Sequence, residues 1–313
     1  MPIGRGDVPQ AVQSEMLKLW PVSASQVTPG QYNKVFEVMT DGRYQVTLAA
    51  LQAAARFTPF GSGVELPNRD PFQGGKVTIT PVMLGEKRSF QFQTVEEVMA
   101  AINTDLKLAC DNWAAAQENT RDLQCSDMLK GSATGYDSKA LFATDHPQMS
   151  RYASAGGSTF SNTDATAAAL SHAVVRDHIV VMEDTNAVTE SGDKMDVKCT
   201  HLCVTSLGQL MELTPILGSN QRAGTANNDQ NAIQQLGITP LLWKNLAGAT
   251  EYMYGFSRQP GQGGLVYINK QSTIIEAQRN FNTKMTEATA HLQGAPSWTD
   301  WRRANRKALT AVA

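Results

Sequence analysis

Two cysteines and a histidine at alternate positions are the residues of this chain best suited to chemistry: Cys199, His201 and Cys203. On a β-strand, alternate side chains point to the same face, and thiolates and imidazoles are both ligands of zinc. The spacing lacks the loop that usually lets two cysteines converge on one metal ion. We therefore expect the face of a packed strand here, with a metal-dependent hydrolase as the alternative.

The dipeptide Asp145-His146 is a second candidate, since a carboxylate can orient a histidine that acts as general base. Adjacent residues rarely face one another, however, and Asp-His followed by Pro147 more simply makes a turn. The chain has no phosphate-binding loop, no Gly-x-Ser-x-Gly elbow and no His-Glu-x-x-His helix. We therefore predict no enzyme, and no catalytic, cofactor-binding or metal-binding residue. The hydrolase alternative would use His146 or the Cys-x-His-x-Cys run.

Basic and aromatic residues alternate near the C-terminus: Trp298, Trp301, Arg302, Arg303, Arg306 and Lys307. Such a pattern can stack on bases and neutralise phosphates. Asp300 lies within it, and the formal net charge of the chain is −2, so we favour a tail that is solvated or paired with another subunit. The tripeptide Arg5-Gly6-Asp7 matches an adhesion motif, which we attribute to chance.

The composition is that of an ordinary globular protein, with 313 residues, 42% hydrophobic and 18% charged. This length suits one large or two medium domains. No apolar run approaches the roughly 18 residues of a membrane span, and the first residues lack a secretory signal. We therefore expect cytoplasmic synthesis and no membrane. The four cysteines are too scattered for a disulfide scaffold, and we expect buried free thiols.

Two short amphipathic segments open the chain. The first carries apolar residues from Val12 to Trp20 and is predicted to end at Pro21, while the second begins at Thr28 and carries Val35, Phe36 and Met39. Residues 57–93 follow as an extended two-stranded arm, with strands predicted at 76–80 and 87–92. Short helices and isolated hairpins are marginal in water, so these pieces need a surface to dock on.

The best-defined element is one long helix. Thr94 and Glu97 form a capping box, and apolar residues recur in steps of three and four from Val95 to Trp113. The pattern ends at Gly131, which gives about 30 to 35 residues and a length of roughly 50 Å. Such a helix suits a strut.

The remaining pattern mixes helices and strands, and it favours an α+β fold over alternating βαβ units. We predict a helix that starts after 161–164 and runs to Glu183, a strand at 195–205, a helix capped by Ser206 that kinks or ends at Pro215, and strands at 238–243, 251–256, 265–268 and 273–277.

One segment carries a family resemblance. Residues 136–147 read Tyr-Asp-Ser-Lys-Ala-Leu-Phe-Ala-Thr-Asp-His-Pro, which resembles the Tyr-Asp-Gly-x-x-Leu-Phe-Ser-Thr-Asp-His-Pro segment of the major head subunit of Mu-like tailed bacteriophages. Ser138 and Ala143 replace the more usual Gly and Ser. Weaker similarities follow in the same order at 161–171, 203–219 and 236–256.

The resemblance implies a Hong Kong 97-type capsid fold, with a division of the chain that agrees with the predicted elements. The implied parts are an N-terminal arm (1–54), an extended loop (55–93), a peripheral domain (94–189) with a spine helix (94–130), an axial domain (190–272), and a return to the peripheral domain with the C-terminal tail (273–313).

The implied function is a major capsid protein that self-assembles into the icosahedral shell of a virion. Pentamers and hexamers of the chain would enclose double-stranded DNA without sequence-specific binding, with portal, scaffolding and decoration proteins as partners, and assembly would take place in the host cytoplasm. The candidate assembly contacts are Phe57, Phe60, Arg69, Asp70 and Trp113. An encapsulin-like compartment is the alternative within the same architecture.

Overall fold

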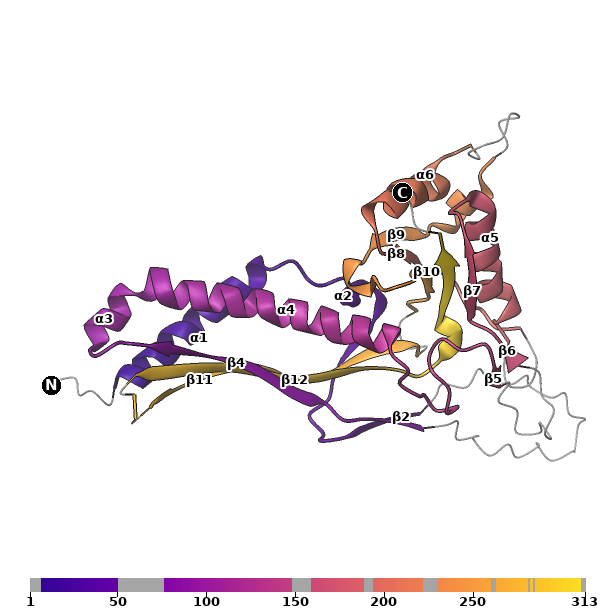
Figure 1. Ribbon diagram of the computed structural model, residues 1–313. Coiled ribbons are helices and arrows are strands. Elements are labelled where there is room, and N and C mark those ends of the chain that lie inside the picture. The colour runs from indigo at the N-terminus through magenta and orange to yellow at the C-terminus, as the bar shows by residue number, and fades with distance from the viewer. Residues whose placement is uncertain are drawn as a thin grey trace, which may run out of the picture.

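The computed structural model describes residues 7–49, 76–147, 159–188, 194–221, 230–259, 263–280, 282–283 and 285–310. Figure 1 shows an elongated arm, in which one long helix lies along a sheet, and an upright head that holds a second sheet flanked by helices. We call these two parts the spine arm and the head. The fold is α+β, as predicted. No described helix combines the length and the apolar character of a membrane span.

The spine helix begins and ends where the sequence predicts. It consists of α3 (Val95–Ala100), a π-helical turn (Ile102–Leu106) and α4 (Lys107–Lys130), and Gly131 closes it. The Thr94 hydroxyl accepts from the Glu97 amide while the Glu97 carboxylate accepts from the Thr94 amide, so the predicted capping box is formed. The π turn interrupts the regular helix and was not predicted.

The sheet of the spine arm has the strand order β1-β11-β12-β4. Its centre is a long antiparallel pair, β11 (Leu265–Arg279) and β12 (Thr286–Trp298). On the outside β4 (Val82–Phe90) runs antiparallel to β12, and β1 (Glu37–Thr40) runs parallel to β11. The strands predicted at 265–268 and 273–277 are therefore one strand, with a register shift between them.

Helix α1 (Val8–Gln26) packs between the spine helix and this sheet, with Val12 and Met16 fully buried. The prediction that the helix ends at Pro21 is wrong, because Pro21 lies inside it. Burial of the apolar stripe offsets the hydrogen bond that proline removes.

The second predicted N-terminal helix, in contrast, is shorter than expected. Only α2 (Tyr32–Val35) is helical, and Val35 and Phe36 are buried as predicted. Met39 is exposed on β1, so its placement on a helix face is wrong. Pairing with β11 gives this backbone a ladder of hydrogen bonds that the helical pattern did not reveal.

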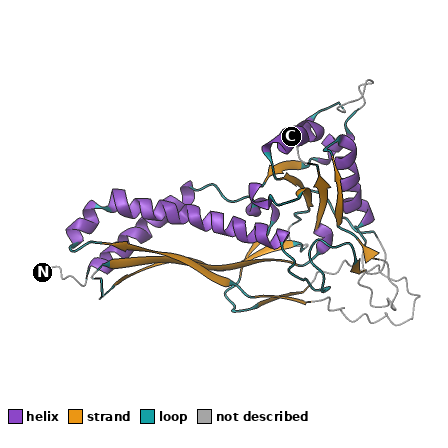
Figure 2. Ribbon diagram, viewed as in Figure 1, coloured by secondary structure: helices purple, strands orange, loops and turns teal. Residues whose placement is uncertain are grey.

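The two predicted arm strands exist, but they do not pair with each other. β3 (Lys76–Ile79) pairs with β2 (Val46–Ala49), and this ribbon packs its Val46 and Ile79 onto Val266 and Ile268 of the main sheet. Figure 2 shows the short strands of this ribbon apart from the long strands of the main sheet. The prediction of one two-stranded arm is therefore wrong, because β4 is an edge strand of the main sheet.

The sheet of the head has the order β7-β13-β10-β8-β9, and α5 and α6 flank it. The bounds of its elements are β7 (Thr163–Ala168), β8 (His201–Val204), β9 (Thr239–Leu242), β10 (Glu251–Phe256), β13 (Ala304–Leu309), α5 (His172–Val180) with a π turn (Val181–Thr185), and α6 (Leu207–Gly218). Smaller elements are β5 (His146–Pro147), β6 (Thr159–Phe160) and the 3-10 helices Ala232–Leu236, Lys244–Leu246 and Trp301–Arg303.

One prediction for the head differs from the structure. The helix expected after 161–164 begins only at His172, capped by Ser171, because residues 163–168 form β7 beside β13. Helix α6 begins at the predicted Ser206 cap and continues through Pro215 to Gly218. Hydrophobic residues from both faces of the head sheet form two separate cores.

Candidate assembly site

The segment that carries the family resemblance, residues 136–147, lies with Gly135 at the junction of spine arm and head, and we call residues 135–147 the motif loop; Leu141, Phe142 and His146 are its buried residues. His146 is 0% exposed, and its Nδ1 lies 2.6 Å from the carboxylate of Asp137 while its Nε2 lies 3.1 Å from the Leu141 carbonyl oxygen. Its ring stacks on Trp301, with the ring centres 4.5 Å apart. The carboxylate partner of His146 is therefore Asp137, and the side chains form a sealed structural pair.

Ser138, which is one of the two departures from the resembled segment, and Asp145 are both exposed on the surface of the motif loop. Ser138, where that segment has Gly, adopts a left-handed backbone with φ 62°, a conformation that glycine adopts at no steric cost. Asp145 points outward and pairs with the Lys139 ammonium, which lowers the pKa of the Asp145 carboxyl. Asp145 and His146 thus face different partners, and the loop leads into β5, which pairs with β6.

Asn162 fastens the motif loop to the C-terminal strand. Its buried amide donates to the carbonyl oxygens of Leu141, Trp301 and Ala304, and its oxygen accepts from the Ala143 amide. Sequence reasoning did not assign this role. The only signal was the position of Asn162 in the weaker part of the resemblance, where an asparagine-containing connection is expected.

The basic and aromatic tail is folded into the subunit, so its prediction as a solvated or intersubunit-paired tail is wrong. Trp298 and Trp301 are buried, and the buried Arg302 pairs with Asp300 at 2.8 Å. The other three basic side chains also have partners within the chain: Arg303 bonds Ser257, Arg306 lies over the rings of Phe142 and Tyr252, and Lys307 pairs with Asp164. These basic side chains can be buried or half-buried because each has a charged, polar or aromatic partner within the chain.

The residues of the Cys-x-His-x-Cys run do not share one face of a strand. Cys199 packs in the core with Leu202, while Cys203 packs in the core on the other side of the head sheet, so the expected common face is wrong. Among the described residues, no group of three or more His, Cys, Asp or Glu side chains is placed to hold a metal ion. All four cysteines are buried free thiols, and burial raises the pKa of Cys199 to about 12. The predicted strand is present at His201–Val204, and Cys199 lies before it.

Trp113 is the one predicted contact residue that the structure describes. It is 3% exposed and packs with Met16, Leu106 and Ile275 between α1, the spine helix and the sheet. This position anchors the spine helix to the body of the subunit, and a contact of Trp113 with another subunit would require this core to open. The other four, Phe57, Phe60, Arg69 and Asp70, lie outside the described residues.

Asp122 joins the far end of the spine helix to the head, a role that sequence reasoning missed. Its buried carboxylate accepts from the Tyr32 amide at 3.0 Å, from Trp243 Nε1 at 2.7 Å and from Asn245 Nδ2 at 2.7 Å. Two segments distant in the sequence, at Tyr32 and at Trp243–Asn245, thus donate to one carboxylate of the spine helix, and these hydrogen bonds connect the spine arm to the head. No local pattern marks Asp122 before folding.

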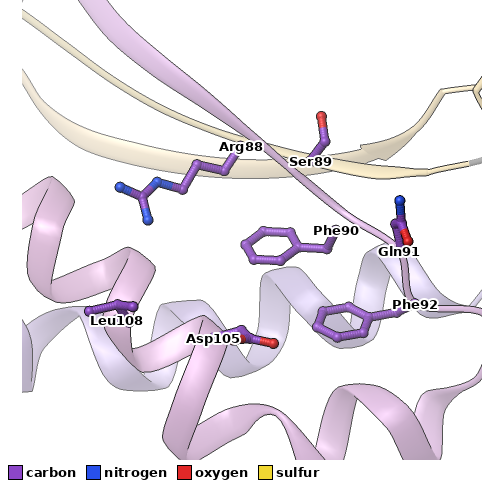
Figure 3. A pocket seen from close by; sticks show the side chains of 7 residues that line it. All are labelled: Arg88, Ser89, Phe90, Gln91, Phe92, Asp105 and Leu108. Atoms are coloured by element: carbon purple, nitrogen blue, oxygen red, sulfur yellow. The ribbon is translucent and has the colours of Figure 1, made fainter.

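The surface of the spine arm is open to other molecules along its outer side. A cavity of about 540 Å³ lies between the end of β4 and the start of the spine helix, lined by Arg88, Phe90, Phe92, Asp105 and Leu108 among others. Figure 3 shows Phe90 and Phe92 side by side in it, with Asp105 and Leu108 on the helix opposite. Large apolar side chains are exposed along the spine arm: Met99 and Leu108 on the spine helix near this cavity, and Val82 and Met83 at the opposite end of β4. Exposed apolar surface of this kind marks protein contacts.

Several solved structures share this architecture. The chain is similar to the procapsid of bacteriophage JBD30 (TM-score 0.55, 12% identity, 97% of this chain and 75% of that chain) and to the mature capsid of bacteriophage PhiM1 (TM-score 0.53, 10% identity, 92% and 89%). It is also similar to a virus-like particle from Pyrococcus furiosus (TM-score 0.50, 8% identity, 95% and 98%). No protein-family model matches the sequence, and a search of curated proteins finds no match.

These similarities extend over most of the chain and define the class: the protein has the Hong Kong 97-type capsid fold. The predicted fold is therefore confirmed, and the long spine helix and two-part body of Figure 1 are parts of it. With sequence identities of 8–12%, these structural similarities establish the fold alone.

Proposed function

We propose that this chain is the major capsid protein of a tailed bacteriophage and that it self-assembles into the icosahedral shell enclosing double-stranded DNA. The observation that carries the proposal is the fold shared with phage procapsid and capsid subunits over 92–97% of the chain. The resemblance of the motif loop to Mu-like head subunits supports the same function and suggests that subtype.

Self-assembly follows from physical features of the subunit. Copies that contact each other through unlike surfaces form rings when the rotation closes, which suits pentamers and hexamers. The spine arm exposes apolar side chains along β4 and the spine helix, and contact with neighbours would bury them. The hydrogen bonds of Asp122 connect the spine arm to the head within each subunit, and a subunit of constant shape would repeat the same contacts.

The domain roles and the contact residues are part of the proposal. We assign residues 1–54 to the N-terminal arm, 55–93 to the extended loop, 94–189 and 273–313 to the peripheral domain, and 190–272 to the axial domain. The loop residues Phe57, Phe60, Arg69 and Asp70 are proposed contacts between subunits, and Trp113 supports the spine helix. Portal, scaffolding and decoration proteins are proposed partners, with assembly in the host cytoplasm.

An encapsulin-like compartment is the second candidate, because the particle from Pyrococcus furiosus shares the fold over 95% of this chain. The two candidates differ in their contents. A viral shell holds DNA and carries a portal complex at one vertex, whereas a compartment holds protein cargo.

Expression of the full chain followed by electron microscopy tests the proposal. We expect closed icosahedral particles or procapsid-like shells, alone or with a scaffolding protein from the same genome neighbourhood. Mass spectrometry and nuclease protection of particles from the native source then separate the candidates. Encapsulated enzyme without nucleic acid would reject the viral shell, and a monomer at high concentration would reject both.

A further inference from the structure

Strand β4 is the long free edge of the spine-arm sheet. β12 pairs with one side of it, and none of the described strands pairs with the other side. Helices α1 and α4 pack on β11 and β12, so β4 lies beyond the cover of both helices. An unpaired edge of this kind presents a row of backbone N–H and C=O groups to which a further strand can add.

Every second residue of β4 faces the spine helix. Glu86 is paired with Ala290 of β12, which is buried in the core between the sheet and the helices. Because paired residues of neighbouring strands share a face, Glu86 and the residues at even distances from it face the helix. Arg88 agrees with this, since its Nε lies 3.6 Å from the Glu86 carboxylate. Figure 3 likewise shows Phe90 and Ser89 on opposite sides of the strand.

The helix-facing residues of β4 are, in chain order, Leu84, Glu86, Arg88 and Phe90. This order is self-complementary when two identical strands pair in antiparallel fashion about Lys87. Each Leu84 then lies opposite a Phe90, and each Glu86 lies opposite an Arg88. Apolar pairs and pairs of opposite charge stabilise neighbouring strands, whereas like charges directly opposite each other destabilise them.

Other centres within the strand do not give this match. A pair centred on Glu86 or on Arg88 opposes two like charges, and a centre at position 85 or 89 sets an apolar residue against a charged one. A pair centred on Lys87 does oppose the two lysines, on the face away from the spine helix. Each Lys87 ammonium there lies 3.2 Å from the Glu287 carboxylate of its own subunit, which offsets their repulsion.

Two cavities lie along the same side of β4. One is the cavity of about 540 Å³ beside Arg88 and Phe90, and the other, of about 360 Å³, lies between Leu84 and Trp113 of the spine helix. In the self-complementary register, the first cavity of one copy lies next to the second cavity of the other. The apolar side chains of both copies would then shield one another from water. Asp105 also lines the first cavity, so Arg88 has an acidic neighbour on its own subunit as well.

We infer that two copies of the subunit join through their β4 strands, antiparallel and centred on Lys87, into one continuous sheet. The two-fold axis of such a pair stands perpendicular to the sheet and leaves both spine helices on the same face. A closed icosahedral shell has two-fold axes perpendicular to its surface, so this pair would join neighbouring rings of subunits. The inference rests on the proposed self-assembly and names one of its contacts, and its test does not require closed shells.

A cysteine at the axis tests the register directly. Opposite residues of antiparallel strands have Cα atoms about 4.5–5.5 Å apart, within the range of about 4.4–6.8 Å that a disulfide spans. Lys87→Cys should therefore cross-link most of the protein into dimers on oxidation with copper phenanthroline, measured by non-reducing electrophoresis. Ser89→Cys is the matched control, exposed on the same face. Its two introduced cysteines would lie about 13 Å apart along the strands and should not cross-link. The four native cysteines are buried.

Charge exchange within the same strand gives a second measurement. Glu86→Arg and Arg88→Glu each set like charges opposite one another at two places in the pair. Each change should weaken the self-association of unassembled subunits about tenfold in sedimentation velocity. The two changes together restore the opposite charges and should restore the association.

Each outcome supports or overturns the inference. Equal cross-linking of both cysteine variants, or of neither, overturns it, and so does a loss of association that the double charge exchange fails to restore. A mixed disulfide between the introduced cysteine of Lys87→Cys and another protein of the native source would show that a different partner covers β4, and this too overturns it. If Lys87→Cys does not fold, the charge exchange decides alone. Wild-type shells without the cross-link in Lys87→Cys shells reject the inference and leave the proposed function standing, whereas cross-linked dimers without shells do the reverse.

Discussion

The buried pair Asp137 and His146 permits a sharp test of how the motif loop works. Both side chains are 0% exposed, and both ring nitrogens of His146 face oxygen acceptors, Asp137 Oδ2 at 2.6 Å and the Leu141 carbonyl at 3.1 Å. The change Asp137→Ala removes one acceptor and leaves the Nδ1 atom of His146 buried against Trp301 without a partner, and it also removes the acceptor of the Lys139 amide.

The expected loss follows from this burial. Removing one member of a buried pair costs about 3–5 kcal/mol, because the other polar group remains desolvated. A typical domain has a free energy of unfolding of about 5–15 kcal/mol, so the loss is a large fraction of it. We expect Asp137→Ala to lower the free energy of unfolding by about 3 kcal/mol. Chemical denaturation followed by tryptophan fluorescence measures it, since Trp301 stacks on His146.

Asp145→Ala is the matched control, in the same loop and with the same change of charge. Asp145 pairs with Lys139 on the surface, where the side chains are 53% and 38% exposed. Solvent screens such a pair, so its removal should leave the denaturation midpoint almost unchanged. Equal midpoints for the two variants would refute the reasoning that the buried pair, rather than the Asp-His dipeptide, holds the loop.

Three further predictions concern packing and titration. Burial lowers the pKa of His178 to about 3 from an unfolded value near 6.5, so the unfolded state binds a proton that the folded state does not. The free energy of unfolding should therefore fall as the pH drops below 6.5, by up to about 1.4 kcal/mol per pH unit, and His178→Gln should show a flatter pH profile in urea titrations. Burial also raises the pKa of all four thiols, among them Cys199, so a thiol reagent at pH 8 should label none in the native protein and four after unfolding; rapid native labelling would contradict the packing. Gly135→Ala would place a methyl group 2.0 Å from Trp298 and should cost about 1–3 kcal/mol, whereas Gly218→Ala, with open space around it, should cost far less; similar thermal shifts for both would count against this contact.

The elements that the sequence predicts correctly are those whose signals are local. The Thr94–Glu97 box, the apolar stripe through Trp113 and the final Gly131 define the spine helix because each acts within a few residues. The Ser206 cap of α6 is of the same kind. The burial of Cys199 and Cys203 as free thiols was also predicted from the sequence, because the four cysteines are too few and too scattered for a disulfide scaffold.

The pairing partners of strands required the tertiary structure. Alternating residues at 76–80 and 87–92 predict two strands equally well whether these strands pair with each other or with distant ones. In the folded chain β4 pairs with β12 about two hundred residues later, and β3 pairs with β2. Residues 165–168 fall within the predicted helix, yet they form part of β7 because that strand pairs with β13.

The sequence alone determined the long spine helix and the apolar stripe of α1, because helix periodicity and caps depend on neighbours in the chain. It also carried the resemblance of the motif loop to head subunits, which is a pattern of consecutive residues. The tertiary structure decided that the basic tail is buried, that Asp137 rather than Asp145 serves His146, and that Asp122 joins three segments. These contacts connect residues far apart in sequence, and their energies depend on burial and on partners that only the folded chain brings within hydrogen-bonding distance.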